Sequence, residues 1–321
     1  AVPGYGVLLH AQVNAAGEGA PVVLMGHMDT VFPAGTVAKR PYREEAGRAY
    51  GPGVADMKSG LVLNVFVAEA FARCGGLKAP LHLFFSCDEE IGSPATRDLI
   101  MDRVRGARAV FNAEPGRVSG NVVTSRKGSM LVEFEVEGVA AHAGINHAAG
   151  ASAIDALARK TLALHALTDP ATGVTANVGV VHGGVVSNMV APHARAELDL
   201  RFTADTNPED LLARVRAIIE EESVPRTQGR ITVARSTLPM KPTPDHLLAL
   251  YQESARTLGF EVQGEFTGGA ADSGLTASVG VPTLCATGPV GGHPHTEREY
   301  CELTTFVPRA QAVALAVLGH P

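Results

Sequence analysis

Acidic and histidine side chains stand directly after several short apolar runs of this sequence. In the segment FFSCDEEIGS, residues 84–93, the acids Asp88, Glu89 and Glu90 follow such a run. Three adjacent carboxylates repel one another, and bound cations would neutralise that charge. The same arrangement recurs at other places in the chain, namely at His27 and Asp29, Asp56, Glu114, and His293 and His295.

Imidazole nitrogens and carboxylate oxygens together form a donor set that suits zinc or another borderline divalent cation. Ligands of open α/β sheets bind beyond the carboxyl ends of the strands, so side chains that follow different strands meet at one edge. The number of carboxylates favours two ions. One carboxylate can bridge two metals about 3.5 to 4 Å apart, with a hydroxide shared between them, as in many hydrolases of amides and phosphates.

The adjacent residues Glu89 and Glu90 are expected to have separate roles. In an extended or turning backbone, neighbouring side chains point in different directions. One of the two can therefore bind metal while the other stays free as the general base for the attacking water. The spacing alone does not say which residue has which role.

Alternating apolar runs and helical stretches supply the elements that would position these residues. Strands are predicted at 22–26, 81–86 and 107–113, with helices at about 57–73 and 94–104 between them. A long loop with three prolines connects the first strand to the first helix. This rhythm predicts an α/β fold with a doubly wound, mostly parallel sheet.

The pattern changes from about residue 128. The stretch SMLVEFEVEGV alternates apolar and acidic residues, a helix is predicted at about 150–166, and two more antiparallel strands and an amphipathic helix follow. After about 238 the α/β pattern returns, with a helix at 245–258, a glycine-rich turn, one strand and a final helix at about 304–318. We therefore predict a di-metal catalytic domain formed by residues 1–126 and 239–321. Residues 127–238 are predicted to form an inserted α+β sandwich domain.

Composition excludes several classes of partner. The chain has 321 residues, a formal net charge of −6 and a pI near 6.1, so it offers no basic footprint for nucleic acid or an anionic membrane surface. It contains no run of about 18 apolar residues and no disulfide pattern among its four cysteines. We expect a soluble, cytoplasmic protein. Because the sequence starts at Ala1 rather than at Met, a signal segment upstream stays open.

Six motifs in a fixed order resemble those of the di-zinc amidohydrolase and peptidase family. This family includes bacterial glutamate carboxypeptidase, aminoacylases, acetylornithine deacetylase and succinyl-diaminopimelate desuccinylase. The motifs lie between about residues 20 and 310 and are GHMDTV, YGPGVADMKSG, DEEIGS, AEPG, AAHAG and HTEREY. Each motif alone is weak, but six in the right order are a strong signal.

The resemblance implies a role for each residue of the predicted catalytic domain. One zinc would be bound by His27 and Glu114 and the other by Glu90 and His295, with Asp56 bridging them, Glu89 as general base and Asp29 hydrogen-bonded to the back of His27. Cobalt or manganese would fit similar sites. His295 is preferred over His293 because of its spacing to Glu299 and Tyr300. The resemblance also implies a cis peptide bond between Asp56 and Met57.

The inserted domain resembles the lid and dimerisation domain of this family, which implies a homodimer. His142 in AAHAG would reach the active site of a partner subunit to stabilise the oxyanion, and Asn188 and Arg201 would hold the substrate. Each has a simpler alternative. His142 could be a lid histidine without a catalytic role, Asn188 a turn residue, and Arg201 an exposed strand arginine beside Asp199.

The function implied is hydrolysis of an amide bond in a peptide or N-acyl amino acid with a free C-terminal carboxylate. The loop at residues 30–53 looks closest to the glutamate carboxypeptidase branch. Those enzymes have an arginine before a proline at the end of the lid, whereas Leu238 precedes Pro239 here, so the preferred amino acid stays open. The alternatives are an N-acyl amino acid deacylase and a binding protein on the same fold without catalysis.

Overall fold

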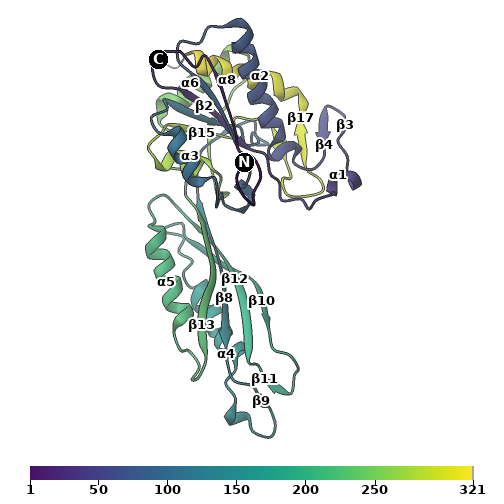
Figure 1. Ribbon diagram of the computed structural model, residues 1–321, viewed down its shortest axis with the longest axis vertical. Helices are drawn as coiled ribbons and strands as arrows, with labels where there is room; N and C mark the ends of the chain where they lie inside the picture. Colours follow the sequence, from purple (N-terminus) through teal and green to yellow (C-terminus); the bar gives the residue numbers. More distant parts are fainter. Residues whose placement is uncertain (320–321) are drawn as a thin grey trace. The chain divides into compact units, whose positions relative to one another are not determined.

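Two units make up the chain in the computed structural model, which describes residues 1–319 (Figure 1). The main unit consists of residues 1–126 together with those from Met240 onward, and the inserted unit consists of residues 127–239. The chain therefore leaves the main unit once and returns to it once. Each unit has an apolar core of its own.

The main unit is built on a seven-stranded sheet. The strand order is β1 (Leu9–Val13), β5 (Leu81–Ser86), β2 (Val22–His27), β6 (Ala109–Asn112), β15 (Thr283–Cys285), β7 (Val122–Arg126) and β14 (Gly264–Thr267). The central strands β5, β2, β6 and β15 run parallel, while β1 is antiparallel at one edge. The predicted α/β class with a mostly parallel sheet is confirmed.

Helices cover both faces of this sheet. The helices α2 (Ser59–Cys74), α6 (Asp245–Thr257) and α8 (Phe306–Gly319) share one core with alternate strand residues such as Val22 and Leu24. The intervening residues Val23 and Met25 point to the other face and are also buried. The helices α3 (Arg97–Val104) and α7 (Ser273–Ser278) contact each other outside that core. Burial on both faces explains why the strands are continuous apolar runs.

A second, small antiparallel sheet lies in the main unit where a long loop was predicted. Its order is β16 (Gly291–Gly292), β17 (Tyr300–Glu302), β4 (Arg48–Tyr50) and β3 (Arg43–Glu45), and the short helix α1 (Thr36–Lys39) precedes it. These strands have two or three residues, too few for a readable alternation. The pairing of β17 with β4 joins residues from opposite ends of the sequence.

The glycine-rich stretch TGGAADSG is also more structured than expected. It was predicted as a turn, but it begins at the end of β14 and runs into α7. The strand β14 is four residues long and pairs with β7, which is distant in sequence. The helix α7 has only six residues, less than two turns, so no helical periodicity is visible in the sequence.

The inserted unit is a four-stranded antiparallel sheet with two helices. The strand order is β10 (Thr175–Gly183), β12 (His193–Phe202), β8 (Gly128–Glu137) and β13 (Gln228–Thr237), and the helices are α4 (Ala153–His165) and α5 (Pro208–Glu220). A short pair, β9 (Ala141–His142) with β11 (Met189–Val190), completes it. Burial alternates strictly along β8, so one face packs on the helices and the other meets water.

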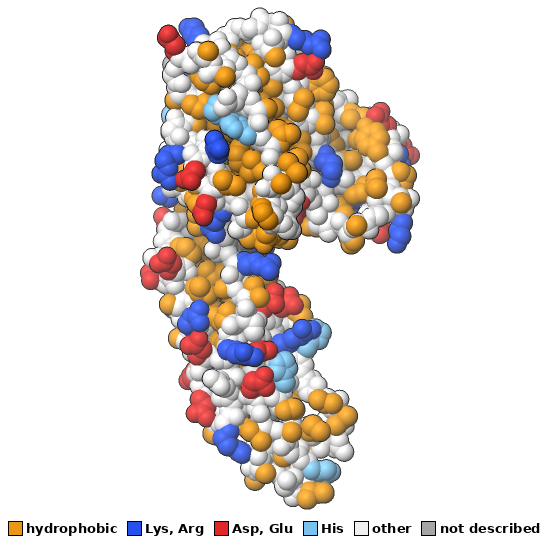
Figure 2. Space-filling model, in the orientation of Figure 1, with side chains coloured by type: hydrophobic (Ala, Val, Ile, Leu, Met, Phe, Trp, Pro, Cys, Tyr) orange, Lys and Arg blue, Asp and Glu red, His pale blue; other side chains and the backbone are white. Residues whose placement is uncertain are grey.

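The surface carries charges of both signs. Basic and acidic side chains are interspersed over the visible face and do not gather by sign (Figure 2). All four cysteines are free. Among residues 1–319, no helix combines the length and apolar character needed to cross a membrane.

Candidate metal centre

The carboxyl ends of three adjacent parallel strands carry the predicted ligands. His27 is the last residue of β2, Glu89 and Glu90 form a short 3-10 turn (Glu89–Ile91) after β5, and Glu114 lies two residues after β6. In the parallel register His27 is level with Ser86. The sheet therefore brings residues that are distant in sequence to the same edge.

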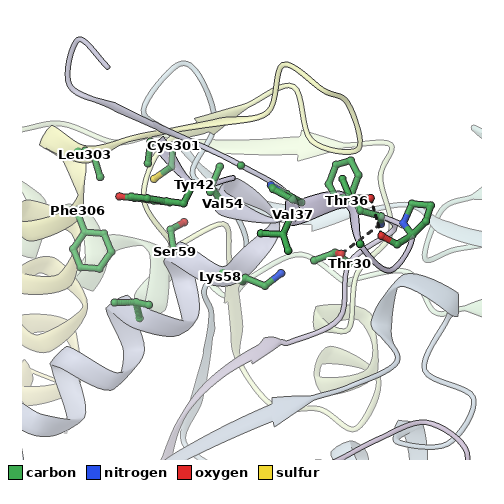
Figure 3. Close-up of a pocket in the computed structure, with 17 residues that line it drawn as sticks. Thr30, Thr36, Val37, Tyr42, Val54, Lys58, Ser59, Cys301, Leu303 and Phe306 are labelled. Atoms are coloured by element: carbon green, nitrogen blue, oxygen red, sulfur yellow. Dashed lines mark hydrogen bonds between the residues drawn. The ribbon is translucent and has the colours of Figure 1, made fainter. Parts of the chain in front are cut away.

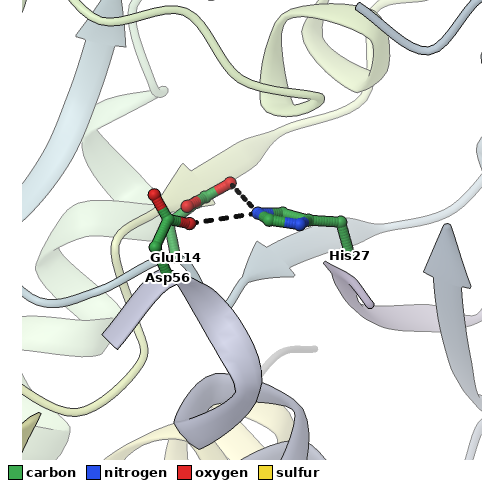
Figure 4. A group of neighbouring side chains, drawn as sticks. All are labelled: His27, Asp56 and Glu114. Carbon is green, nitrogen blue, oxygen red and sulfur yellow. Dashed lines mark hydrogen bonds and ion pairs between the residues drawn. The ribbon is translucent and has the colours of Figure 1, made fainter. Parts of the chain in front are cut away.

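A first group of possible metal ligands consists of His27, Asp56 and Glu114 (Figure 4). The Nε2 atom of His27 lies 3.1 Å from Oδ1 of Asp56 and 3.8 Å from Oε1 of Glu114. His27 and Glu114 are buried, with 2% and 5% of their surface exposed. One imidazole nitrogen and two carboxylate oxygens thus face a common point.

A second group consists of Asp56, Glu90 and His295. The Nε2 atom of His295 lies 3.2 Å from Oδ2 of Asp56 and 3.3 Å from Oε2 of Glu90. Asp56 is therefore shared, since its Oδ1 faces His27 and its Oδ2 faces His295. This is the arrangement expected of a carboxylate that bridges two ions.

The local backbone holds Asp56 between the two groups. Asp56 lies in a π-turn (Val54–Lys58) that leads into α2, and its peptide bond to Met57 is cis, as the resemblance implies. Gly60 then allows the start of α2 to approach the end of β6. A Cβ atom at Gly60 would lie only 1.9 Å from the carbonyl oxygen of Ala113, the neighbour of Glu114.

Asp29 contacts both the first histidine and the acidic turn. Nδ1 of His27 lies 3.1 Å from the carbonyl oxygen of Asp29 and 3.4 Å from its carboxylate Oδ1. The same carboxylate accepts hydrogen bonds from the backbone N–H groups of Glu89 and Glu90, at 3.3 and 3.0 Å. Asp29 therefore orients His27 and also fixes the turn, a second contact that the sequence did not predict.

Glu89 stands beside both groups without belonging to either. Its Oε2 lies 3.9 Å from Nε2 of His27. Burial raises the pKa of Glu89 well above its usual range, and the nearby charge of His27 only partly offsets this. A raised carboxyl pKa suits a group that takes up a proton and later releases it.

Sequence reasoning missed the roles of two further buried acids. Asp88, the first acid of the run, accepts hydrogen bonds from the backbone of Ala95 and Thr96 at 2.8 and 3.2 Å, so it supports the turn before α3. Asp272 accepts from the hydroxyls of Ser86, at 3.0 Å, and Ser93. It thereby joins the two ends of the acidic turn. An aspartate within a glycine-rich stretch gave no signal for this contact.

The charges of the centre conflict without a cation. Burial and the neighbouring charge of Asp56 together raise the pKa of Glu114 to about 7. Hydrogen bonds to Asp56 and Glu90 raise the pKa of His295 to about 10. Burial lowers the pKa of His27, but the carboxylates of Asp29 and Asp56 outweigh it and hold that pKa well above the usual value. The raised pKa values mean that these groups favour their protonated forms. A bound cation would satisfy the same carboxylate oxygens in place of the protons.

One buried carboxylate oxygen supports a metal directly. The Oε1 atom of Glu90 is buried and has no hydrogen-bond partner. An unpartnered buried carboxylate oxygen is costly, and a metal ion would satisfy it. The donors are nitrogen and oxygen atoms without thiolates. The residues therefore fit a pair of borderline divalent ions.

Comparisons with known proteins agree with this geometry. Residues 23–319 match the model of the peptidase family M20/M25/M40. The chain belongs to the M20/M25/M40 peptidase family. It is 28% identical over 309 residues to carboxypeptidase G2 of a Pseudomonas species, covering 94% of this chain and 74% of that protein. It is 29% identical over 309 residues to a succinyl-diaminopimelate desuccinylase of Burkholderia lata, covering 89% and 79%.

A solved structure has the same fold. The M20 family metallo-carboxypeptidase Sso-CP2 of Sulfolobus solfataricus superposes with a TM-score of 0.81 at 18% identity, covering 98% of this chain and 88% of that one. The match to the family model confirms the predicted family. The M20 chain described here is a metal-dependent hydrolase of amide bonds.

A largely apolar pocket of about 580 Å³ is lined in part by residues that follow the proposed metal-site residues in the sequence (Figure 3). Thr30, which follows Asp29, and Lys58, two residues after Asp56, contribute to its wall. Most other lining residues are apolar, including Val37, Val54 and Phe306. Among the described residues that line it, Lys58 alone is charged, and burial lowers the pKa of that ammonium group. The pocket therefore favours an apolar group.

The remaining predicted site residues lie in the inserted unit. His142 is exposed at the end of β9, and its Nδ1 accepts from the backbone of Gly144 and Ile145 at 3.1 and 3.2 Å. Asn188 lies in a turn before β11. Arg201 on β12 pairs with Asp199 through two hydrogen bonds of 2.8 and 2.9 Å. Their roles toward a substrate stay predictions.

Proposed function

We propose that this M20 protein is a dinuclear metal hydrolase that acts as a carboxypeptidase. It would cleave the amide bond of a peptide or N-acyl amino acid that carries a free C-terminal carboxylate. The observation that carries the proposal is the position of Asp56, whose two carboxylate oxygens face two separate ligand groups at 3.1 and 3.2 Å. A site for one ion would not need a carboxylate shared in this way.

The proposed ligands divide between the two ions. His27 and Glu114 would hold one zinc, Glu90 and His295 would hold the other, and Asp56 would contact both; cobalt or manganese would suit the same donors. When bound, such a pair of ions supplies polarisation of the scissile carbonyl and a lowered pKa of water. The protein contributes a fixed, buried arrangement of donors. Asp29 holds both His27 and the acidic turn in place.

Glu89 is the proposed general base. Its carboxylate takes the proton of the attacking water and then returns it to the leaving amine, so it ends the cycle as it began. Burial raises its pKa well above the usual range, which suits a carboxylate that takes up and returns a proton. The carboxylate of the neighbouring Glu90 faces His295. We therefore assign the proton exchange to Glu89.

The inserted unit is proposed to act as a lid and to pair two chains. His142 would reach the active site of the partner subunit and stabilise the negative charge that develops on the carbonyl oxygen. Asn188 and Arg201 would bind the substrate, with Arg201 pairing with its carboxylate. Arg201 would have to exchange its pair with Asp199 for a pair with the substrate.

A deacylase is the second candidate. The similarity to a succinyl-diaminopimelate desuccinylase supports it as directly as the similarity to carboxypeptidase G2 supports a carboxypeptidase. Both reactions use the same donors and the same base. They differ in which side of the amide bond is recognised.

A hydrolysis panel tests the proposal. Dipeptides and N-acyl amino acids are varied at each end, including apolar residues that suit the pocket, and are assayed with and without a chelator. Cleavage that requires the free C-terminal carboxylate and stops with chelator supports the carboxypeptidase. Cleavage that depends on the acyl group alone supports the deacylase. Bound metal without cleavage of any substrate would instead indicate a binding protein.

A further inference from the structure

Glu299 is a fully buried carboxylate that contacts the backbone leading to Asp56. Its Oε1 accepts hydrogen bonds from the N–H groups of Ala55 and Asp56 at 2.9 and 3.0 Å, and its Oε2 accepts from Gly53 at 3.0 Å. None of its side chain is exposed. A charged group in such a position is stable only when its hydrogen bonds are satisfied.

These three hydrogen bonds replace bonds that regular structure would supply. Within the π-turn, Asp56 has φ −109° and ψ 95°, which is not helical. Buried N–H groups in such a segment need acceptors from elsewhere. Glu299 provides them for three residues in a row of four, and the last is the shared ligand itself. The carboxylate of Glu299 therefore fixes the backbone from which both oxygens of Asp56 project.

Glu299 is also tied to the loop that carries His295. Its backbone N–H donates to the carbonyl oxygen of Thr296 at 3.2 Å, and Nη1 of Arg40 donates to the same oxygen at 2.8 Å. His295 has a φ of +62°, a left-handed conformation that residues other than glycine rarely adopt. Such a conformation persists when the surrounding contacts determine it.

Arg40 links the two halves of this arrangement. Its Nη2 lies 3.9 Å from Oε2 of Glu299, while its Nη1 binds Thr296 next to His295. The guanidinium thus offsets the buried charge of Glu299 and contacts the histidine loop. The side chain of Glu299 bonds to backbone groups rather than to the side chains of the proposed metal ligands.

We propose that Glu299 is a positioning residue that aligns Asp56 and His295, and so sets the affinity of the centre for its metal ions. This inference rests on the proposed dinuclear function. Partners that orient metal ligands typically change metal affinity or activity by about 10- to 100-fold when they are removed. Because the carboxylate of Glu299 is buried and bonded to backbone N–H groups, its loss should act on metal binding and kcat rather than on KM.

Two variants of Glu299 and one matched control test the proposal. Glu299→Ala removes all three acceptors. Glu299→Gln keeps one oxygen for Ala55 and Asp56 but turns an amide toward the N–H of Gly53. The control is Leu247→Ala, which opens the core between α2, α6 and α8. The melting temperature, the metal content after competition with a chromophoric chelator, kcat and KM are measured for each.

The expected result separates positioning from general stability. Glu299→Ala should lose at least about tenfold in resistance to the chelator and at least about tenfold in kcat, with KM changed less than about threefold. Glu299→Gln should recover part of both losses. Leu247→Ala should melt earlier but keep its metal content and kcat at a temperature where it is folded.

The outcomes that overturn the proposal are distinct from failure of the proposed function. Wild-type chelator resistance and kcat in Glu299→Ala would refute it, as would losses no larger than those of Leu247→Ala at an equal drop in melting temperature. If Glu299→Ala does not fold, the test rests on Glu299→Gln. Resistance to the chelator equal to that of the wild type in that variant would refute the proposal. Failure of the wild-type protein to bind metal would instead refute the dinuclear function.

Discussion

The two units of this chain treat their charged side chains in opposite ways. The main unit buries Glu114 and Asp56 against each other at the strand ends, and one oxygen of Glu90 has no partner. The inserted unit has paired charges at its surface, for example Arg159 with Asp155. The main unit accepts an electrostatic conflict that the inserted unit avoids.

The one deeply buried cation of the inserted unit makes the contrast sharper. Lys160 is 2% exposed, yet its ammonium group donates to the carbonyl oxygens of Ile218, at 3.2 Å, and Glu221. Burial lowers its pKa, and the opposite charge of Glu221 partly offsets this. A buried charge whose hydrogen bonds are satisfied in this way is compatible with a packed core. Buried like charges without partners at a sheet edge indicate a ligand-binding site.

The largest expected effect comes from Glu89→Gln. This change removes the proposed base but keeps its size, so kcat should fall by about 10²- to 10⁴-fold while metal content stays at the wild-type level. Metal analysis and steady-state kinetics check this. Turnover within about tenfold of wild type would remove Glu89 from its role, and loss of metal would make it a ligand instead.

How far the sequence predicts this contrast depends on the range of the contacts involved. The strands β2, β5 and β6 are continuous buried runs, so their ends and the residues after them could be placed from the sequence. The alternation of apolar and polar residues along β8 likewise predicted an antiparallel strand with one face exposed to water. In both cases a local pattern carries the information.

Contacts between distant segments could not be predicted in this way. The small sheet joins Arg48 to Glu302, which are 254 residues apart. Three adjacent acids were visible, but the geometry of the turn decides that Asp88 faces the backbone just before α3 while Glu90 faces His295. The ligand assignment came from the resemblance, because no local pattern distinguishes Glu89 from Glu90.

The inserted unit can be tested for a chemical role by mixing two inactive variants. If His142 acts on the partner subunit, Glu89→Gln and His142→Ala fail for different reasons. In a mixed dimer, the site that keeps Glu89 receives His142 from the other chain. Random reassortment should therefore restore roughly a quarter of the wild-type sites, because half of the dimers are mixed and each has one complete site.

Size-exclusion chromatography with light scattering establishes whether dimers form, and each variant incubated alone is the control. No recovery in mixtures that do reassort would place His142 in its own subunit or outside the mechanism. In that case the inserted unit would contribute no catalytic residue across the dimer.

The charge conflict of the main unit predicts a pH dependence of the metal-free protein. Glu114 has a pKa of about 7 when folded and its usual, lower value when unfolded, so its protonated form stabilises the fold. That contribution is complete below the unfolded pKa and is lost as pH rises through 7. Between about pH 5 and 6.5 the contribution of Glu114 to the free energy of unfolding should fall by about 2 kcal/mol.

The variant Glu114→Gln is the matched control for that measurement. It stays neutral, so its free energy of unfolding should fall less steeply with pH over the same range, and the fall that remains comes from other buried carboxyls with a raised pKa, such as Glu89. Above about pH 6.5 both proteins should lose stability, because the pKa of His295 is raised to about 10 and its contribution declines from its unfolded pKa upward. Urea titrations at several pH values, with and without added zinc, measure this. An equal slope in both proteins below pH 6.5 would contradict the assignment to Glu114.

The smallest effect is expected at a third group of acids and histidine, in the inserted unit. Glu135, Glu137 and His193 lie close enough together to hold an ion. However, Glu135 pairs with Arg230, and the side chains of Glu137 and His193 are about half exposed. Water and a neighbouring cation already satisfy this group.

We therefore expect His193→Ala to keep the metal content of the wild type and to change the free energy of unfolding by less than about 0.5 kcal/mol. Metal analysis and urea unfolding measure both quantities, with His27→Ala as the contrasting variant that should lose metal. Loss of an ion from His193→Ala would mean that similar residue types bind metal in both units. Burial without hydrogen-bond partners would then not be the property that separates the two metal-binding groups of the main unit from the third group.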